Sequence, residues 1–272
     1  MTMADKGAPP LIDNDVHAAA ATGYASSADT YAMGRPGYSP ETAPWLTGVL
    51  GLGSGRLVLD LGAGTGKFLP NLRATGARLI ALEPVMAMRA RLERSNPDVE
   101  AVGGTATAIP LADASLDCVV CAQAFHWFAN TAALAEIRRV LKPGGMLGLI
   151  WNVRDESVPW VANLSAITDA YEADTPRYRS GAWRKLFPAK GFECVDERHA
   201  GNAHIGPAER VVVDRTLSVS FIAALPPAER DKIAAKVRAL IAATPALTGQ
   251  AEVSFPYVTA MYAYRKAAGP EA

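Results

Sequence analysis

The sequence contains little cysteine and no excess charge of either sign. Only three cysteines occur in 272 residues, which is too few for a disulfide framework. Lysine plus arginine and aspartate plus glutamate each number 27, so the formal net charge is zero. A basic excess is the usual electrostatic footprint of a nucleic-acid-binding protein. We therefore expect no nucleic-acid partner.

Long apolar runs are also missing. No stretch approaches the roughly 20 apolar residues that a membrane-spanning helix needs. The first residues lack the apolar segment of a secretory signal, because Asp5 and Lys6 are followed by Pro9 and Pro10. These absences predict a cytoplasmic protein with no membrane span.

Residues that ligate metals are scarce and scattered. The four histidines show no ligand spacing, so we predict no metal site. Cys118 and Cys121 spell C-x-x-C, but they lie in an apolar run typical of a strand. Because strand side chains alternate between faces, the two thiols should point in opposite directions. We expect both to behave as small buried hydrophobic residues.

Half of the residues are hydrophobic, which is enough for a sizeable core. Residues 1–15 are aperiodic and predict a disordered tail, whereas residues 16–272 predict one domain. The alanine-rich stretch 16–32 predicts a helix that carries Tyr24 and Tyr31 on one face.

One glycine-rich motif organises the rest of the chain. The apolar run Leu57–Leu61 predicts a buried strand, and it leads into Asp60-Leu61-Gly62-Ala63-Gly64-Thr65-Gly66. Glycines in such a turn tolerate positive φ and let a ligand approach the main chain. Open α/β sheets bind ligands at this end of their strands. The motif therefore predicts a nucleotide-type site.

Two familiar fingerprints do not fit this loop. A dinucleotide site needs G-x-G-x-x-G, but Lys67 occupies the third glycine position. A P-loop needs glycine at Leu61 and serine or threonine at Phe68. The acid Asp60 would repel a pyrophosphate and suits a ligand with an ammonium group. A nicotinamide oxidoreductase is therefore disfavoured.

Further apolar runs alternate with helical patterns, which predicts a parallel, doubly wound α/β sheet. A final strand is expected at the sheet edge, where Pro256 is tolerated. The aromatic-rich segment 152–190 predicts helices that cap the ligand cleft. We therefore divide the domain into a core of about 40–151 and 191–266 and a cap of about 152–190. The predicted strands after the first are 78–83, 99–102, 117–122, 146–151, 191–195 and 253–262.

Taken in order, these motifs resemble class I S-adenosylmethionine (SAM)-dependent methyltransferases. The resemblance covers nearly the whole chain and is to the small-molecule type, similar to the ubiquinone/menaquinone-biosynthesis and trans-aconitate methyltransferase families. It implies a Rossmann-like, seven-stranded, mostly parallel sheet with an antiparallel last strand, helices on both faces and a helical cap after strand five. It also implies methyl transfer from SAM to an oxygen, nitrogen or carboxylate acceptor, with S-adenosylhomocysteine (SAH) as product.

The resemblance implies a set of cofactor-binding residues. Asp60 and the carbonyls of Gly62 and Gln123 would accept from the ammonium group of SAM, and Arg35 would donate to its carboxylate. Glu83 follows the loop by about twenty residues, the spacing at which an acid accepts from ribose hydroxyls. The remaining expected contacts are Ala63, Gly64, Pro84, Thr105, Ala106 and Ala124. Thr105 stands where the family often has an acid, which puts that one adenine contact in doubt.

A substrate pocket is expected beside the cofactor. His126 follows the fourth strand and is either a general base or a pocket wall among aromatic residues. Arg154 or Arg215 would anchor a carboxylate acceptor, or each serves the structure alone. The predicted pocket consists of Tyr24, Tyr31, His126, Trp127, Trp151 and Arg154.

A non-catalytic SAM-binding regulatory or partner subunit is the main alternative. Asp60, Glu83 and an aromatic-lined mouth favour an enzyme over such a subunit. A nucleic-acid methyltransferase is disfavoured by the neutral charge and by the absence of Asn-Pro-Pro-aromatic or Pro-Cys motifs. We expect a small-molecule substrate and a monomer or homodimer.

Overall fold

The structure is a computed structural model that describes residues 36–172 and 175–267. The predicted tail at 1–15, the predicted helix at 16–32 with Tyr24 and Tyr31, and Arg35 lie outside the described residues. The strands are β1 Leu57–Leu61, β2 Arg78–Leu82, β3 Glu100–Val102, β4 Leu116–Ala122, β5 Leu141–Arg154, β6 Phe192–Gly206 and β7 Val253–Lys266. The α-helices are α3 Thr42–Gly48, α4 Leu69–Arg73, α5 Met86–Ser95, α6 Thr131–Val140, α7 Pro159–Asp169, α8 Arg215–Leu217, α9 Ser220–Ala223 and α10 Pro227–Ala242. Short 3-10 helices are η1 Phe125–Trp127, η2 Tyr178–Ser180 and η3 Ala182–Leu186, and η4 Glu209–Asp214 is a π-helical turn.

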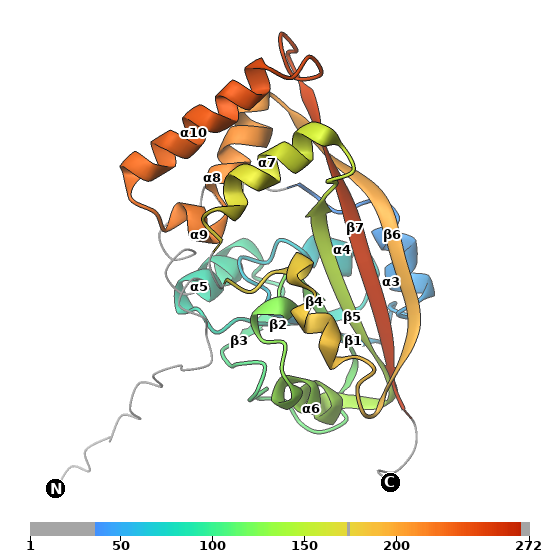
Figure 1. Cartoon of the computed structure of the whole chain (residues 1–272). Coiled ribbons are helices and arrows are strands. Elements are labelled where there is room, and N and C mark those ends of the chain that lie inside the picture. The colour runs from blue at the N-terminus through green and yellow to red at the C-terminus, as the bar shows by residue number, and fades with distance from the viewer. Residues whose placement is uncertain (1–35, 173–174, 268–272) are drawn as a thin grey trace, which may run out of the picture.

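The seven strands form one sheet in the order β3–β2–β1–β4–β5–β7–β6 (Figure 1). The pairs from β3 to β5 are parallel, whereas β7 runs antiparallel to both β5 and β6. The chain order reverses beside β1, which has β2 on one side and β4 on the other. Such a switch point is where open α/β sheets bind ligands. The predicted Rossmann-like sheet with an antiparallel last strand is confirmed.

Two hydrophobic clusters cover the two faces of the sheet. Cys118 belongs to the cluster that contains Trp45 of α3 and Leu69 of α4. Cys121, three residues further along β4, belongs to the opposite cluster with Ile137 of α6. Both thiols are fully buried, as their places on the strand predicted. Helices therefore cover both faces of the sheet.

The expectation that β7 is an edge strand is wrong, because β7 lies between β5 and β6. Pro256 is nevertheless accommodated. It pairs with Ala203 of β6, and its carbonyl accepts from the Asp155 N–H on the side of β5. The β5 ladder has already ended there, at the pair Arg154–Tyr257. The missing N–H of proline therefore faces a position beyond the end of β5, where no ladder bond is required.

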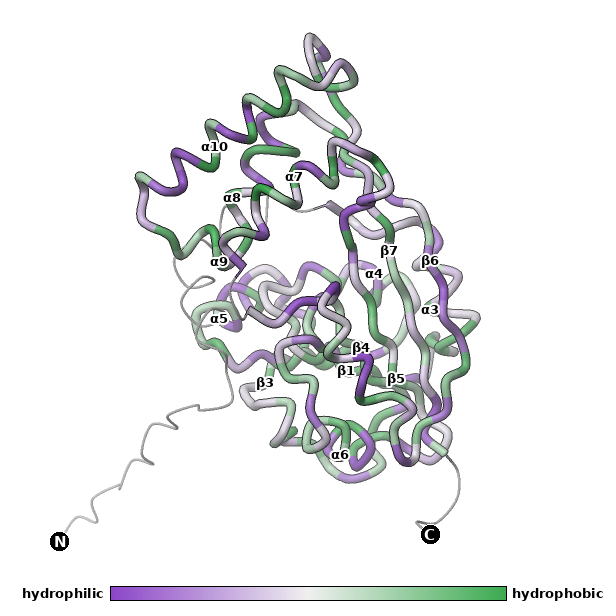
Figure 2. The backbone as a smooth tube through the Cα atoms, in the orientation of Figure 1, coloured by the Kyte–Doolittle hydropathy of each residue, from purple (hydrophilic) through white to green (hydrophobic). Residues whose placement is uncertain are grey.

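The cap has its own hydrophobic cluster, built from two insertions. Trp160 of α7 packs with Val212 of η4, Ile233 of α10 and Phe255 of β7. Residues 207–247, which the sequence prediction assigned to the core, thus supply most of the cap helices beside α7. Figure 1 shows α7–α10 gathered at one end of the sheet, and Figure 2 shows hydrophilic and hydrophobic residues alternating along α10.

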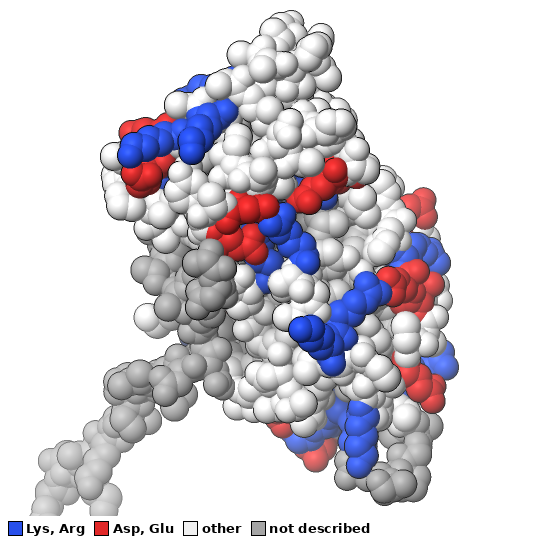
Figure 3. Space-filling view, in the orientation of Figure 1, with Lys and Arg blue, Asp and Glu red and all other residues white. Residues whose placement is uncertain are grey.

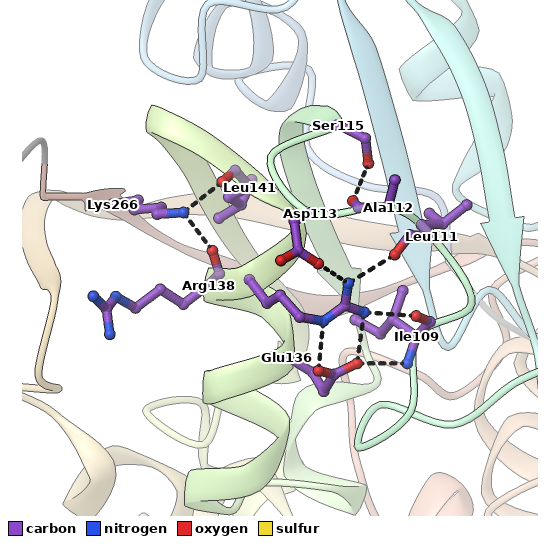
Figure 4. A network of polar contacts seen from close by, with 10 residues as sticks. Ile109, Leu111, Ala112, Asp113, Ser115, Glu136, Arg138, Leu141 and Lys266 are labelled. Carbon is purple, nitrogen blue, oxygen red and sulfur yellow. Dashed lines mark hydrogen bonds and ion pairs between the residues drawn. The ribbon is translucent and has the colours of Figure 1, made fainter.

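An arginine in α6 fastens the loop between β3 and β4 (Figure 4). The Arg139 guanidinium donates to the carbonyls of Ile109 and Leu111, each at 2.8 Å. It also forms ion pairs of 2.7 Å with Asp113 and Glu136, and Glu136 accepts from the Ile109 N–H at 2.9 Å. This loop begins with cavity-lining residues described below, so the network positions the site.

Replacing Arg139 by methionine should lower the free energy of unfolding by about 2–3 kcal/mol, because two carbonyls and two carboxylates lose a charged donor. The side chain is only 30% exposed, so water replaces these bonds incompletely. Urea denaturation of the wild type and the variant measures this difference. Arg78→Met, at an exposed arginine on β2, is the control and should change stability by about 0.5 kcal/mol or less. Equal effects of the two substitutions would contradict the network.

Candidate active site

The glycine loop extends from β1 and remains paired with β2. The N–H groups of Gly62 and Ala63 both donate to the Leu82 carbonyl, at 2.9 and 3.0 Å. Gly62 has φ +76°, and a Cβ added there would lie 2.7 Å from the Cβ of Ala124. Any larger residue would clash with the segment that follows β4. Glycine is therefore required for the close approach of the two strand ends.

Glu83 holds the loop from the end of β2. Its carboxylate accepts from the Gly64 N–H at 2.8 Å and from the Val85 N–H at 2.9 Å. Burial raises the pKa of Glu83, and these two backbone hydrogen bonds oppose the rise. The side chain is 5% exposed. Each carboxylate oxygen keeps a lone pair for a ligand hydroxyl.

Asp60 is a buried carboxylate with an unusual environment. It is 1% exposed, and within the described residues neither oxygen has a hydrogen-bond partner. Burial, and secondarily the charge of Glu83, raises its pKa to about 7. Near neutral pH the side chain is therefore close to half protonated. A cationic ligand group is the partner that would complete it.

These groups line a cavity of about 180 Å³. Ten of the eleven predicted cofactor residues lie on its wall, and the eleventh, Arg35, lies outside the described residues. The ten are Asp60, Gly62, Ala63, Gly64, Glu83, Pro84, Thr105, Ala106, Gln123 and Ala124. The apolar side chains of Phe68, Met88 and Phe128 also line this cavity.

A second cavity of about 240 Å³ adjoins the first, between the sheet and the cap. His126, Trp127, Trp151 and Arg154, all predicted for the substrate pocket, line it. The other two predicted residues, Tyr24 and Tyr31, lie outside the described part of the chain. The two cavities share a wall formed by Gln123, Trp127, Asn152, Arg215 and Tyr257.

Gln123 holds a strained conformation in this shared wall. Its φ is +60°, which is uncommon for a residue with a Cβ. Two hydrogen bonds fix it: its N–H donates to Ile150 at 2.8 Å, and its side-chain amide donates to the Asn152 carbonyl at 3.1 Å. Strain of this kind persists only where surrounding structure enforces it, and it clusters at functional sites.

One ring nitrogen of His126 accepts a hydrogen bond from Trp151. The Trp151 indole N–H donates to His126 Nδ1 at 3.0 Å. An indole nitrogen is only a donor, so Nδ1 must be the acceptor and the ring proton of the neutral side chain is on Nε2. In this state the ring presents an N–H donor at Nε2. Acting as a base would require a different tautomer and loss of the Trp151 hydrogen bond.

The sequence analysis missed two residues of the shared wall. Asn152 directly follows the predicted fifth strand but was not assigned to a site. Its side-chain oxygen accepts from the Thr259 hydroxyl at 2.6 Å. Tyr257 comes from β7 and was read only as part of a strand. Its register opposite Arg154 is set by antiparallel pairing across about a hundred residues of sequence, and no local pattern signals such a pairing.

Three global features of the described residues complete the picture. Their His, Cys, Asp and Glu side chains form no group of three or more that could hold a metal ion. None of their helices has the length and apolar content needed to cross a bilayer. On the face shown in Figure 3, positive and negative side chains lie interspersed.

Comparisons with known proteins agree with this geometry. Residues 59–149 match a family described as a methyltransferase domain. An uncharacterized methyltransferase-like protein of Schizosaccharomyces pombe is 37% identical over 87% of this chain and 92% of its own length. An uncharacterized methyltransferase of Mycobacterium bovis is also 37% identical, with the same coverage of both chains.

A solved structure shares the fold. A proposed type II methyltransferase from Anaeromyxobacter dehalogenans superimposes with a TM-score of 0.63 at 23% identity, covering 87% of this chain and 99% of that one. With the loop, the strand order and the curated relatives, the family is shown: the chain belongs to the class I SAM-dependent methyltransferases.

The raised pKa of Asp60 makes protein stability depend on pH. A buried carboxyl is more stable neutral, so its contribution to stability is fully present below pH 3.8 and is lost as pH rises through about 7. Relative to Asp60→Asn, the unfolding free energy of the wild type should fall by roughly 1.4 kcal/mol per pH unit in that window. Urea denaturation at pH 4.5, 5.5, 6.5 and 8 checks this.

The comparison between the two proteins cancels the titrating groups that they share and that do not interact with Asp60. Glu83 is coupled to Asp60 through its charge, so the same comparison is repeated in a Glu83→Gln background. A wild-type curve parallel to the Asp60→Asn curve at every pH would contradict the assignment. Above about pH 7.5 the difference should level off, since the carboxyl is then ionised in both folded and unfolded states.

Proposed function

We propose that this protein transfers a methyl group from S-adenosylmethionine to a small-molecule acceptor. The observation that carries the proposal is the pair of adjoining cavities. The first holds a buried carboxylate with no hydrogen-bond partner among the described residues, and the second is lined by aromatic side chains. Because the two cavities share lining residues, a cofactor in the first and an acceptor in the second would meet where the cavities join, which is the arrangement that direct transfer needs.

The residues of the first cavity fit this cofactor. The two Asp60 oxygens without hydrogen-bond partners suit an ammonium group. Glu83 retains acceptor capacity for ribose hydroxyls, and Gly62 and Gly64 leave the main chain open to close approach. Phe68, Met88 and Phe128 offer apolar contact to an adenine ring. The ammonium, ribose and adenine parts of the cofactor thus each have a chemically matching group in the wall.

Bound SAM supplies a methyl group on a sulfonium, which is an already activated leaving group. The protein's own residues then have to position the acceptor and exclude water, contributions that reach roughly 7–11 kcal/mol in well-oriented systems. Gln123 is fixed in a strained conformation where the two cavities meet, and the ring of Trp127 packs against His126 there. Trp151, which lines the second cavity, packs against Trp183. Side chains held in this way are suited to positioning an acceptor.

His126 fits a role in the wall as a hydrogen-bond donor. Its Nδ1 atom is engaged by Trp151, so the neutral ring offers an N–H from Nε2. The Trp127 ring lies 5.1 Å from it, centroid to centroid. We therefore assign His126 to positioning the acceptor, with no proton taken from it.

Binding of SAH tests the cofactor assignment. Calorimetry should detect SAH with micromolar affinity and NADH not at all. Glu83→Gln should weaken SAH binding by about tenfold or more, because a charged acceptor is replaced by a neutral one. Glu93→Gln, at an exposed glutamate of α5, is the matched control and should leave affinity unchanged. Binding of NADH instead of SAH would sink the proposal.

The role of His126 is tested by the pH dependence of turnover, once screening has supplied an acceptor. His126→Gln keeps an N–H donor and should change kcat by less than about threefold at any pH between 6 and 9, with KM for the acceptor bearing most of the effect. His199→Gln, on β6 and away from both cavities, is the control. A general base would instead show a loss of about 100-fold or more at high pH.

A further inference from the structure

The second cavity has a cationic wall, which bears on the acceptor and rests on the function proposed above. Four arginines and one glutamate line it within the described residues, together with neutral polar and aromatic side chains. Pockets for neutral metabolites seldom need so many guanidinium groups. The charged members are Arg154, Arg177, Arg179, Arg215 and Glu156.

Two of the four arginines are neutralised by the protein. Arg179 forms ion pairs with Asp169 at 2.5 Å and Glu156 at 3.2 Å. Arg177 forms one with Glu172 at 3.4 Å. These guanidiniums therefore serve mainly to hold the cap segments together.

Arg154 is different. Across the described ranges it has no carboxylate within ion-pair distance, and its hydrogen bonds go to two hydroxyls, Thr168 at 3.2 Å and Ser165 at 3.5 Å. The pKa of Arg154 is lowered to about 10, mainly by burial. The guanidiniums of Arg215 and Arg177 act in the same direction, and Tyr257 and Asp169 oppose them. Burying a cation without an anionic partner costs free energy. A guanidinium in this position therefore suggests that a ligand supplies the negative charge.

Tyr257 presents a second donor beside it. The two residues are register partners on β5 and β7, so their side chains emerge next to each other. Tyr257 is 2% exposed, and its buried hydroxyl has no hydrogen-bond partner among the described residues. It lines both cavities. The Tyr257 hydroxyl and the Arg154 guanidinium are therefore neighbouring donors. A carboxylate can accept hydrogen bonds from both at once, because its two oxygens offer about four lone pairs.

The rest of the cavity is suited to an apolar body. Trp127, Trp151, Tyr178 and Phe221 contribute ring surfaces to its wall. Trp151 is packed against Tyr178 with ring centroids 5.1 Å apart, so this part of the wall is preformed.

We propose that the methyl acceptor is a small organic acid whose carboxylate is bound by Arg154 and Tyr257, with its apolar part against the aromatic wall. The planar, bidentate geometry of guanidinium favours a carboxylate, whose two oxygens accept two parallel N–H bonds. A phosphate ester would bring up to two charges to the same donors.

Calorimetry of the full chain saturated with SAH tests this without requiring turnover. The probes are 3-phenylpropanoate and pentanoate, each compared with its amide, together with phenylphosphonate. The carboxylates should bind at least about tenfold more tightly than their amides, because only they pair with Arg154. Arg154→Met should reduce that preference to about twofold or less, and Tyr257→Phe should reduce it in part.

Arg198→Met, at a half-exposed arginine on β6 outside both cavities, is the matched control and should keep the preference. SAH affinity should stay within about twofold of wild type in Arg154→Met and Arg198→Met, since neither residue lines the first cavity, and this shows that they are folded. Thermal melting checks the folding of Tyr257→Phe. Equal binding of carboxylates and amides by the wild type, or tighter binding of phenylphosphonate, overturns the proposal even if a variant fails to fold. Failure of the wild type to bind SAH would overturn the proposed function instead.

Discussion

A buried carboxylate that has no hydrogen bond within the described residues is the constraint on which this site depends. Asp60 lies near the carboxyl end of β1, and the hydrophobic strands β2 and β4 on either side exclude the water that would solvate it. A pKa near 7 in place of 3.8 corresponds to a penalty on the order of 4 kcal/mol for the ionised form. The fold carries this cost at the one place where a cationic ligand group can offset it, so binding free energy and folding free energy are linked through a single side chain.

The backbone around Asp60 is arranged to keep that carboxylate accessible from one side only. Gly62 brings the loop against Ala124, and Glu83 fixes the loop from the neighbouring strand by accepting from Gly64. Gln123 turns the chain away after β4 at a positive φ. Each of these contacts joins the carboxyl end of a different parallel strand. The site is therefore a product of the sheet's topology as much as of its glycine motif.

Much of this arrangement could be predicted from local patterns. The apolar run at 57–61, the glycine spacing and the acid at Glu83 were sufficient to place the strand, the loop and the nucleotide-type site. The family resemblance supplied further residues that line the cavity, such as Thr105, Ala106 and Ala124. Each of those signals lies within a short window of sequence. The full length of β6 was not predictable in the same way, because half of its residues are exposed and its ladder with β7 determines where it ends.

Long-range pairing also explains the residues that were missed. Tyr257 reaches the shared wall only because β7 is inserted between β5 and β6, against the expectation of an edge strand. The second half of the cap, residues 207–247, gave an ordinary amphipathic signal that fits a core helix equally well. Only its packing on α7 shows where it belongs. Periodicity identifies a buried face and does not identify the surface that buries it.

The separate hydrophobic cluster of the cap has a consequence for how this protein diversifies. Most of the first cavity's wall is anchored in the two clusters of the sheet, whereas Arg177, Phe221 and much of the second cavity's wall are carried by segments that pack around the third. Substitutions that reshape the cap therefore change the packing of the third cluster and leave the packing of the two sheet clusters intact. In such a protein the second cavity can change its shape and charge in small steps while the first cavity keeps its form.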